Sequence, residues 1–339
     1  MSKGKNVMKA GVIGLGVGAH HFRALNSHGN CQVVAISDFS KSKSKALVDR
    51  HPDIVVVENF VEMLKCDSIE LVSIASYDQY HYEQIIRAIE HQKHVFVEKP
   101  LCQKFEETQH VRDLLESNPK IALSMNMVLR TCPLFQKVRE EIQMKMYGEV
   151  FYLESDYLWG RIHKLTTGWR RELVDYSIIL GAAIHVIDLS MWLLGERPDE
   201  VHAFGNNIAT RTTEFQVNSF SVMLIKFPSG VVAKVSGNGG CVHPHFHSLK
   251  VFGSEKTVYH DLSATNTFSR KGMEVETQYM EEAYPGKEFR GEVVTSFVDS
   301  IQNIGSPMVS VEDVFSVMSV CFAAEKSIKT GKACEVTYI

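Results

Sequence analysis

A glycine-rich stretch near the start of the chain has the residue types and spacing that bind a diphosphate. Gly14-Leu15-Gly16-Val17-Gly18-Ala19 lies between an apolar run at residues 10–13 and a helix-length segment at residues 19–27. In this G-x-G-x-x-A spacing Gly14 permits a tight turn, Gly16 lets the backbone approach the phosphates, and Ala19 keeps the helix close to the sheet. The first amides and the positive dipole end of that helix would bind the phosphates. We therefore expect the six residues to bind a dinucleotide.

An aspartate follows the second apolar run, where the ribose of such a cofactor would lie. Asp38 directly follows the run at residues 33–37 and comes 24 residues after Gly14. A carboxylate there accepts hydrogen bonds from ribose hydroxyls and disfavours a 2′-phosphate, so the sequence predicts NAD. Lys41 and Lys43 follow closely and would favour a 2′-phosphate, which leaves NADP open. The alternative for Asp38 is a turn or helix-cap residue.

Short apolar runs alternate with helix-length segments over the first 126 residues. Several runs are apolar at consecutive positions, which is typical of strands buried on both faces of a parallel sheet. The alternation predicts a doubly wound α/β domain, a Rossmann fold, over residues 1–126. The expected strands are residues 10–13, 33–37, 54–57, 71–75, 94–97 and 121–124, and the expected helices include 19–27, 81–90 and 105–116.

After residue 126 the segments become longer and alternate between apolar and polar residues. This pattern predicts an α+β domain over residues 127–339 with a large, mostly antiparallel sheet, and with a last helix that packs back toward the first domain. We expect this domain to bind the substrate and to form the oligomer. One face of that large sheet would stay open, and covering it predicts a homodimer or homotetramer. The expected strands are residues 149–159, 200–206, 220–227, 231–236, 248–252 and 257–260, and the expected helices are 133–146, 183–194, 291–304 and 311–330.

The composition argues against several classes of protein. Lys and Arg number 36 and Asp and Glu number 40, so the formal net charge of −4 does not suit a nucleic-acid-binding protein. No apolar run approaches the ~18 residues of a membrane span, and the first residues lack the apolar core of a signal peptide. Seven cysteines without paired spacing predict reduced thiols and a cytoplasmic location.

Several further stretches are more specific. Glu98-Lys99-Pro100 ends the fifth expected strand, and His185-Val186-Ile187-Asp188 lies in the expected helix at residues 183–194. In their order and spacing they resemble the glucose-fructose oxidoreductase, inositol dehydrogenase and MocA family. The resemblance covers nearly the whole chain and extends to residues 74–83, Arg130-x-x-Pro133, Gly168-Trp169-Arg170, Glu312-Asp313 and Thr330-Gly331-Lys332.

The resemblance implies a Rossmann domain, a second α/β domain, and an enzyme that oxidises or reduces one carbon of a sugar, cyclitol or nucleotide-linked sugar. It implies that Glu98 and Lys99 lie beside the nicotinamide and that Lys99 touches the reacting hydroxyl. It makes His185 the second polar group at the reacting carbon. The other implied contacts are Ser76, Tyr77, His81, Trp169 and Arg170 for the cofactor and Arg130 for the substrate. Arg161 and Arg170 also flank a loop that could hold an anionic group of the substrate.

Oxidation of an alcohol by hydride transfer requires a base within hydrogen-bond reach of the hydroxyl. Desolvation and a positive nicotinamide ring would lower the pKa of Lys99 enough for this work. A neutral His185 could accept or relay the proton instead. The sequence leaves the choice open; we expect Lys99 as acid/base, His185 as its orienting partner or alternate base, and Asp188 as a tether for neighbouring backbone.

Two positions depart from the family pattern. The family usually has an acidic residue four positions before the histidine, where this chain has Gly181, and commonly a proline where it has Tyr77. Either Lys99 and His185 suffice, or another group such as Asp175 substitutes, or catalysis has been lost. In the last case the chain would be a cofactor-binding sensor or regulatory protein of the same fold.

A histidine-rich tract at residues 241–247 has a second possible chemistry. Extended backbone would point His243, His245 and His247 to one face, and three imidazoles can bind zinc. Pro244 interrupts the strand and no fourth ligand is evident. We therefore expect the tract to line the substrate pocket or form a solvated loop, and we predict no metal site.

Overall fold

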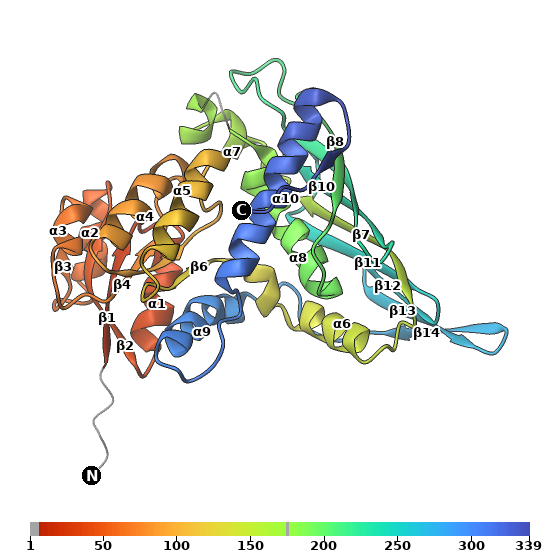
Figure 1. Cartoon of the computed structure of the whole chain (residues 1–339), viewed down its shortest axis with the longest axis horizontal. Coiled ribbons are helices and arrows are strands. Elements are labelled where there is room, and N and C mark those ends of the chain that lie inside the picture. Colours follow the sequence, from red (N-terminus) through yellow and green to blue (C-terminus); the bar gives the residue numbers. More distant parts are fainter. Residues whose placement is uncertain (1–6, 174–175) are drawn as a thin grey trace, which may run out of the picture. The chain divides into compact units, whose positions relative to one another are not determined.

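The chain folds into two compact units (Figure 1). The computed structural model describes residues 7–173 and 176–339. Unit 1 takes in the described residues up to 128 with residues 287–315 and 339, and unit 2 comprises residues 129–286 and 316–338. The sequence predicted one boundary after residue 126. The segment at residues 287–315 belongs with unit 1 because its helix α9 (Glu292–Ile301) packs against α1 (Gly18–Ser27).

Unit 1 is built on a parallel sheet with the strand order β3-β2-β1-β4-β5-β6. The residues of β4 and β5 are apolar at nearly every position because both faces of a central parallel strand are buried. The strand order reverses between β1 and β4, and ligands of such sheets bind beyond the carboxyl ends of the strands at that point. The strands are β1 (Met8–Ile13), β2 (Cys31–Ser37), β3 (Val55–Val56), β4 (Leu71–Ile74), β5 (His94–Val97) and β6 (Leu123–Met125).

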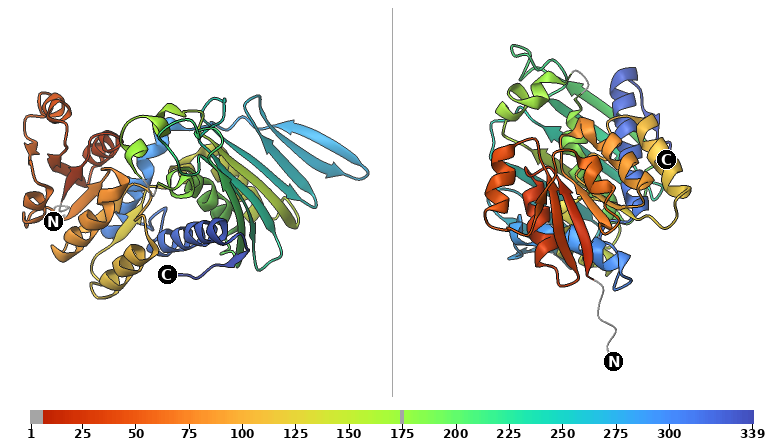
Figure 2. Two further views of the ribbon diagram at one scale, coloured as in Figure 1. Left: turned by 90° about the horizontal axis from the view of Figure 1, so that it is seen from above. Right: turned by 90° about the vertical axis from the view of Figure 1, so that its left-hand side faces the viewer.

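Helices flank both faces of this sheet (Figure 2). Helix α4 packs on α5 and β5, and its apolar residues Ile85, Ala88 and Ile89 are buried because they share one helical face. Together with the strand order, this arrangement confirms the doubly wound fold expected from the sequence. Besides α1 and α9, the helices of unit 1 that lie between its strands in the sequence are α2 (Lys41–Val48), α3 (Phe60–Leu64), α4 (His81–Glu90) and α5 (Phe105–Glu116).

Unit 2 contains a nine-stranded sheet with the order β14-β13-β12-β11-β7-β10-β9-β8-β15. The central pair β7 and β10 is parallel and the other pairs are antiparallel, so the mostly antiparallel sheet expected is confirmed. The strands are β7 (Val150–Leu158), β8 (Glu200–Asn206), β9 (Phe220–Lys226), β10 (Val232–Asn238), β11 (Phe246–Gly253), β12 (Lys256–His260), β13 (Thr265–Lys271), β14 (Glu274–Tyr279) and β15 (Cys334–Glu335).

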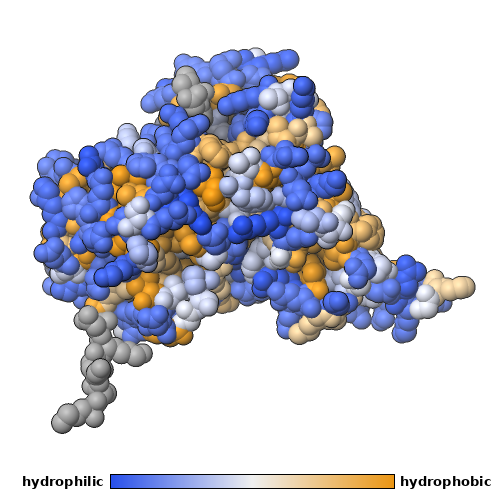
Figure 3. Space-filling model, viewed as in Figure 1, coloured by the Kyte–Doolittle hydropathy of each residue, from blue (hydrophilic) through white to orange (hydrophobic). Residues whose placement is uncertain are grey.

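The hairpin of β13 and β14 was not among the expected strands. Every residue of β14 is exposed, so no alternation of apolar and polar residues marks it in the sequence. In Figure 3 the hairpin is a largely hydrophilic arm with an apolar tip. Met273, in the turn between the two strands, is almost fully exposed.

One buried helix forms the core of unit 2 beside the sheet. Helix α8 (Ile184–Leu194) packs against β7, β10 and α6 (Pro133–Gln143), and a π-helical turn at Ile179–Ala183 leads into it. The expected helix at residues 183–194 did not include that turn because the whole segment is apolar and carries no readable period. Helix α10 (Val311–Thr330) begins in unit 1 and continues into unit 2. Across residues 7–173 and 176–339, no helix has the length and apolar character needed to cross a membrane.

A buried ion pair joins α6 to the sheet of unit 2. Lys256 Nζ on β12 lies 2.7 Å from Glu141 Oε2 on α6, and both residues are buried. The ammonium group also lies 5.4 Å from the centroid of the Tyr147 ring. Removal of one partner would leave the other charge unpaired in a medium of low dielectric constant.

Glu141→Ala is therefore expected to lower the free energy of unfolding by about 3 kcal/mol. The double variant Glu141→Leu/Lys256→Met should lose less, because it removes both charges. Glu140→Ala, which breaks the exposed pair with Lys137, is the matched control and should leave the unfolding midpoint nearly unchanged. Urea unfolding of the full chain measures all three, and equal losses for Glu141→Ala and Glu140→Ala would contradict the expectation.

Candidate active site

The glycine-rich turn joins β1 to α1 and presses against the end of β4. Gly14 has a φ of +87°, a left-handed value that favours glycine, and its amide donates to the Ser37 carbonyl at 2.7 Å. A Cβ added to Gly14 would overlap the carbonyl of Ala75, whereas a Cβ added to Gly16 would meet nothing within 4 Å. The backbone at Gly14 thus leaves no room for a side chain, whereas the space beside Gly16 is empty. This is the geometry that a bound diphosphate requires.

The start of α1 leaves its first amides available. Among the described side chains none caps this helix, and its N-cap residue Val17 already has helical backbone angles. Its first turn carries no acidic residue. The first amides and the helix dipole can therefore act on a phosphate beside Gly16 and Gly18.

A cavity of about 820 Å³ lies beside this turn in unit 1, with Gly14, Gly16 and Asp38 in its wall. Asp38 Oδ1 accepts a hydrogen bond from the Ser40 amide at 2.6 Å, and Oδ2 accepts one from the Leu15 amide. These bonds fix the carboxylate in the cavity wall. Because an ionised carboxylate has about four lone-pair sites, about two remain for the hydroxyls of a ribose.

Three aromatic side chains gather beside this cavity. The centroid of Phe39 lies 6.4 Å from that of Tyr77 and 5.5 Å from that of Tyr80. Phe39 and Tyr77 line the cavity, and Phe39 is 75% exposed. Exposed flat rings provide a surface on which an adenine can stack. Tyr77, the departure from the family's proline, belongs to this cluster.

Glu98 is the centre of a hydrogen-bond network at the carboxyl ends of the strands. Its Oε1 accepts a hydrogen bond from Asn126 Nδ2 at 2.6 Å and lies 3.0 Å from His21 Nε2. His21 Nδ1 in turn lies 2.8 Å from Ser73 Oγ. Burial alone would raise the pKa of the Glu98 carboxyl, but the hydrogen bonds from His21 and Asn126 bring that pKa below its ordinary value. Glu98 is therefore a fixed, ionised neighbour of Lys99.

His81, a predicted cofactor contact, is fully buried and connects two loops. Its Nδ1 lies 2.7 Å from the carbonyl oxygen of Pro100, and its Nε2 lies 3.4 Å from that of Ser76. The Lys99–Pro100 peptide is cis. Ser76 lines the cavity and donates its hydroxyl to Gln84 Oε1 at 2.7 Å. His81 thus connects the loop that carries Ser76 to the loop that carries Lys99 and Pro100.

In unit 2, His185 lies in a cluster of imidazole and phenol rings on the helix-covered face of the sheet. Its ring is 7% exposed and stacks on Tyr157 of β7, with centroids 5.9 Å apart and planes 13° apart. His247 of β11 lies edge-on at 6.4 Å. Tyr157 Oη lies 3.0 Å from His245 Nε2, and Tyr284 Oη lies 2.8 Å from His247 Nδ1. One histidine of the tract, His247, thus lies beside the predicted site histidine, and a second, His245, contacts Tyr157.

The spacing of the three histidines in this tract is also compatible with a zinc site. Over residues 7–173 and 176–339, no group of three or more His, Cys, Asp or Glu side chains is arranged to hold a metal ion. His243 is half-buried, and its Nδ1 lies 2.7 Å from the Pro244 carbonyl. His245 and His247 instead contact Tyr157.

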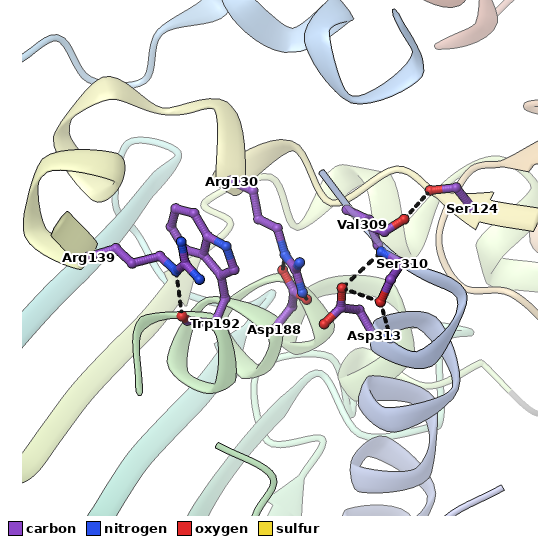
Figure 4. A network of polar contacts seen from close by, with 8 residues as sticks. All are labelled: Ser124, Arg130, Arg139, Asp188, Trp192, Val309, Ser310 and Asp313. Atoms are coloured by element: carbon purple, nitrogen blue, oxygen red, sulfur yellow. Dashed lines mark hydrogen bonds and ion pairs between the residues drawn. The ribbon is translucent and has the colours of Figure 1, made fainter. Parts of the chain in front are cut away.

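Arg130, a predicted substrate contact, is buried in an ion pair (Figure 4). Its Nη2 and Nε lie 2.6 Å and 3.0 Å from the two carboxylate oxygens of Asp188 on α8. Asp188 was expected to tether backbone and instead holds this guanidinium. Beside the pair, Arg139 donates to the Trp192 carbonyl at 3.0 Å. These contacts hold helix α8, which carries His185. The bonds among Ser124, Val309, Ser310 and Asp313 in Figure 4 belong to unit 1.

A positively charged segment carries the predicted contacts Arg161, Trp169 and Arg170. Arg170 Cζ lies 4.1 Å from the ring centroid of Trp169 and 5.4 Å from that of Trp159. Burial and the charges of Arg161 and Arg170 lower the pKa of Lys164. Asp175, the acid that could replace the one missing at position 181, lies outside the described residues.

The structure brings together the predicted cofactor contacts of unit 1 and, separately, the His185 cluster of unit 2. Lys99 belongs to the first and His185 to the second, so their partnership stays a prediction. Sequence reasoning missed the roles of Asn126 and Tyr157. Their positions carried a weak signal: Asn126 follows the last strand of a parallel sheet, and Tyr157 points inward in the alternation of β7.

The fold and these residues define a dinucleotide-dependent oxidoreductase of two units. The chain matches the sequence profile described as "Oxidoreductase family, NAD-binding Rossmann fold" over residues 8–127 and the "GFO/IDH/MocA C-terminal domain" over residues 135–259. Together the two matches span most of the chain. The chain belongs to the Gfo/Idh/MocA family of oxidoreductases, as the sequence resemblance predicted.

Several relatives are similar over much of their length. Myo-inositol 2-dehydrogenase of Thermotoga maritima is 22% identical over 346 residues, which cover 96% of this chain and 98% of that protein. The 2,7-anhydro-N-acetylneuraminate hydratase of Escherichia coli is 23% identical over 258 residues, covering 75% and 68%. The structure of scyllo-inositol dehydrogenase from Lactobacillus casei, solved with NAD(H) and scyllo-inositol, has a TM-score of 0.80 at 18% identity and covers 97% and 99%. The likeness to that structure shows the shared fold.

Asp38→Ala is expected to weaken NAD binding about tenfold, since about 1.4 kcal/mol of hydrogen bonding to the ribose is lost. The preference for NAD over NADP should shrink at the same time, because the carboxylate no longer repels a 2′-phosphate. Asp67→Ala, at an exposed position outside the cavity, is the control. Titration calorimetry with both cofactors measures the effect, and unchanged NAD affinity in Asp38→Ala would contradict the assignment.

Proposed function

We propose that the chain transfers a hydride between NAD and a carbinol carbon of a cyclitol or sugar. The observation that carries the proposal is the fixed carboxylate of Glu98 next to Lys99, at the carboxyl edge of the sheet that binds the cofactor. Ligands of doubly wound sheets bind at this edge. Two of the relatives described above are named inositol dehydrogenases, and their similarity over nearly the full length supports a polyol as the substrate.

The chain's own residues must move the hydroxyl proton. NAD, when bound, takes up or supplies the hydride. Lys99 would hold the substrate hydroxyl and take its proton in the direction of oxidation, because a desolvated amine beside a positive ring can be neutral. Glu98, fixed by His21 and Asn126, would orient Lys99. His185 would contact the same hydroxyl as the orienting partner or as the alternate base.

Other predicted contacts receive more specific roles in this proposal. Trp169 and Arg170 would approach the cofactor, and Arg161 would attract an anionic group of the substrate or cofactor. Arg130 would act on the substrate only through Asp188, because its guanidinium is buried in that ion pair. Phe39 and Tyr77 would stack on the adenine.

Lys99→Ala tests the proposal. The variant should lose activity by about 100-fold or more, the contribution of a positioned acid/base, while its affinity for NAD changes little. Lys120→Ala, at an exposed position of unit 1, is the matched control. Formation of reduced nicotinamide with a panel of cyclitols and sugars measures turnover, and fluorescence titration measures NAD binding.

Two outcomes would contradict the enzyme assignment. One is a Lys99→Ala variant as active as the wild type. The other is a wild-type protein that binds NAD tightly and turns over no compound of the panel. The second result would favour the alternative of a cofactor-binding sensor or regulatory protein.

We also propose that the open face of the unit 2 sheet pairs with a second copy of the chain. Helices cover one face of the sheet, and the left view of Figure 2 shows the other face without them. On that open face Phe204 and Leu224 are exposed, and Lys234 and Asp156 form an ion pair of 2.6 Å. A face that mixes exposed apolar groups with paired charges is typical of a surface that becomes covered.

Leu224→Glu is expected to shift the protein toward the monomer, because it places an unpaired charge on that face. Met144→Glu introduces the same charge at an exposed position after α6 and is the control. Sedimentation velocity measures the distribution of species. A wild-type protein that sediments as a monomer at micromolar concentration would contradict the proposal.

The location of the protein also belongs to these proposals. The seven cysteines all lie in the part of the chain that the structure describes; none of them forms a disulfide bond there, and most are buried. Burial raises the pKa of the Cys31 thiol to about 12, so this group is an unreactive part of the core. Free thiols are typical of a reducing compartment, and we propose the cytoplasm.

A further inference from the structure

Gly181 lies in the π-helical turn Ile179–Ala183, four positions before His185. Residues four apart on a helix share a face, with Cβ atoms about 5–6 Å apart. A side chain at position 181 would therefore stand beside the imidazole of His185. Glycine offers no side-chain group there.

The hydroxyl of Tyr176 occupies that place. A Cβ built on Gly181 would overlap Tyr176 Oη and would lie 2.6 Å from Cζ and 3.2 Å from Cε2. The phenol oxygen thus lies where the first side-chain atom of residue 181 would be, so this position tolerates only glycine while Tyr176 is present. Tyr176 is 4% exposed, and bulk water does not compete for the site.

The ring of Tyr176 is held by three neighbours. Its centroid lies 6.5 Å from that of Trp169, at 77° between planes, and 5.7 Å from that of Phe215, at 65°. Arg170 Cζ lies 5.9 Å from the same centroid. Because a tyrosine has only two side-chain torsions, this packing sets the position of the hydroxyl. π-Helical turns of the kind that presents Gly181 are frequent at functional sites.

We propose that Tyr176 is a positioning residue for His185, supplying beside the imidazole the hydrogen-bonding group that Gly181 lacks. The proposal rests on the proposed function, since it assigns Tyr176 a part in the same proton transfer. A phenol both donates and accepts a hydrogen bond and, with an ordinary pKa of about 10, stays neutral at neutral pH. Tyr176 keeps its own proton while the substrate hydroxyl passes its proton to Lys99 or His185 and its carbon passes a hydride to NAD.

The other groups that face His185 come from the sheet and from its own helix. Tyr157 of β7 stacks on the ring, His247 of β11 lies edge-on to it, and His245 contacts Tyr157. Asp188 on α8 is paired with Arg130. Substitutions at positions 176 and 181 change none of these groups, so they isolate the effect of the phenol.

Tyr176→Phe removes only the hydroxyl. Its kcat is expected to fall about tenfold, which corresponds to ~1.4 kcal/mol. KM and the Kd for NAD should stay within about twofold of the wild type, because the lost contact acts in the transition state. Tyr338→Phe is the matched control, since the Tyr338 hydroxyl donates to the Pro198 carbonyl at 2.7 Å elsewhere in unit 2 and its loss should leave kcat unchanged.

A second pair of variants tests whether a side chain at position 181 reaches the imidazole of His185. Tyr176→Ala opens the space, and Tyr176→Ala/Gly181→Asp fills it with a carboxylate. The double variant should recover part of the kcat lost in Tyr176→Ala. Its His185 should titrate about one pH unit higher by NMR than in Tyr176→Ala, because a nearby anion favours the imidazolium. The acidic limb of its pH–rate profile should move in the same direction.

Wild-type kcat and an unchanged pH–rate profile in Tyr176→Phe would overturn the proposal. An unchanged His185 titration in the double variant would also overturn it, since position 181 would then not reach the imidazole. The NMR titration needs no substrate. It therefore separates failure of this proposal from failure of the proposed function, in which the wild type turns over no compound of the panel.

Discussion

The backbone of Gly14 runs so close to the carbonyl of Ala75 that no side chain fits between them, and unit 1 depends on this contact. It joins the end of β1 to the end of β4, the two strands between which the sheet order reverses. The same turn directs the Leu15 amide to Asp38 at the end of β2. Three strand ends are thereby fixed around one cavity, which is lined by the backbone of the glycine-rich turn and by one carboxylate.

The chemistry beyond NAD binding depends on side chains held by long-range contacts. In unit 1, Glu98 is fixed by His21 from α1 and by Asn126 after β6. In unit 2, Asp188 is fixed by Arg130, and this pair orients the helix that also carries His185. In both cases a buried charge finds its partner on a different element. Such pairs are costly to break, which keeps these side chains in one arrangement.

The two groups of predicted site residues, one in each unit, differ in their electrostatic surroundings. The Glu98 carboxylate stays ionised because its hydrogen bonds outweigh the effect of burial on its pKa. Around His185 lie the rings of Tyr157 and His247, and at the position of the family's usual acidic residue Gly181 leaves room for the phenol of Tyr176.

The sequence by itself determined the doubly wound domain, the glycine-rich turn, Asp38 and the mostly antiparallel second sheet. It did so because turn geometry, strand burial and the distance from turn to ribose are local properties, readable from residue type and spacing. The sequence did not predict the β13–β14 hairpin or the π-helical turn, since β14 is exposed along its whole length and the turn is uniformly apolar. Only the tertiary structure decided that His21 contacts Glu98 and that Arg130 forms an ion pair with Asp188. The same holds for the contacts of His245 and His247 with Tyr157, and for the position of the Tyr176 hydroxyl beside Gly181. Most of these contacts join residues far apart in the chain, and all of them depend on how side chains pack in three dimensions, which no spacing in the sequence records.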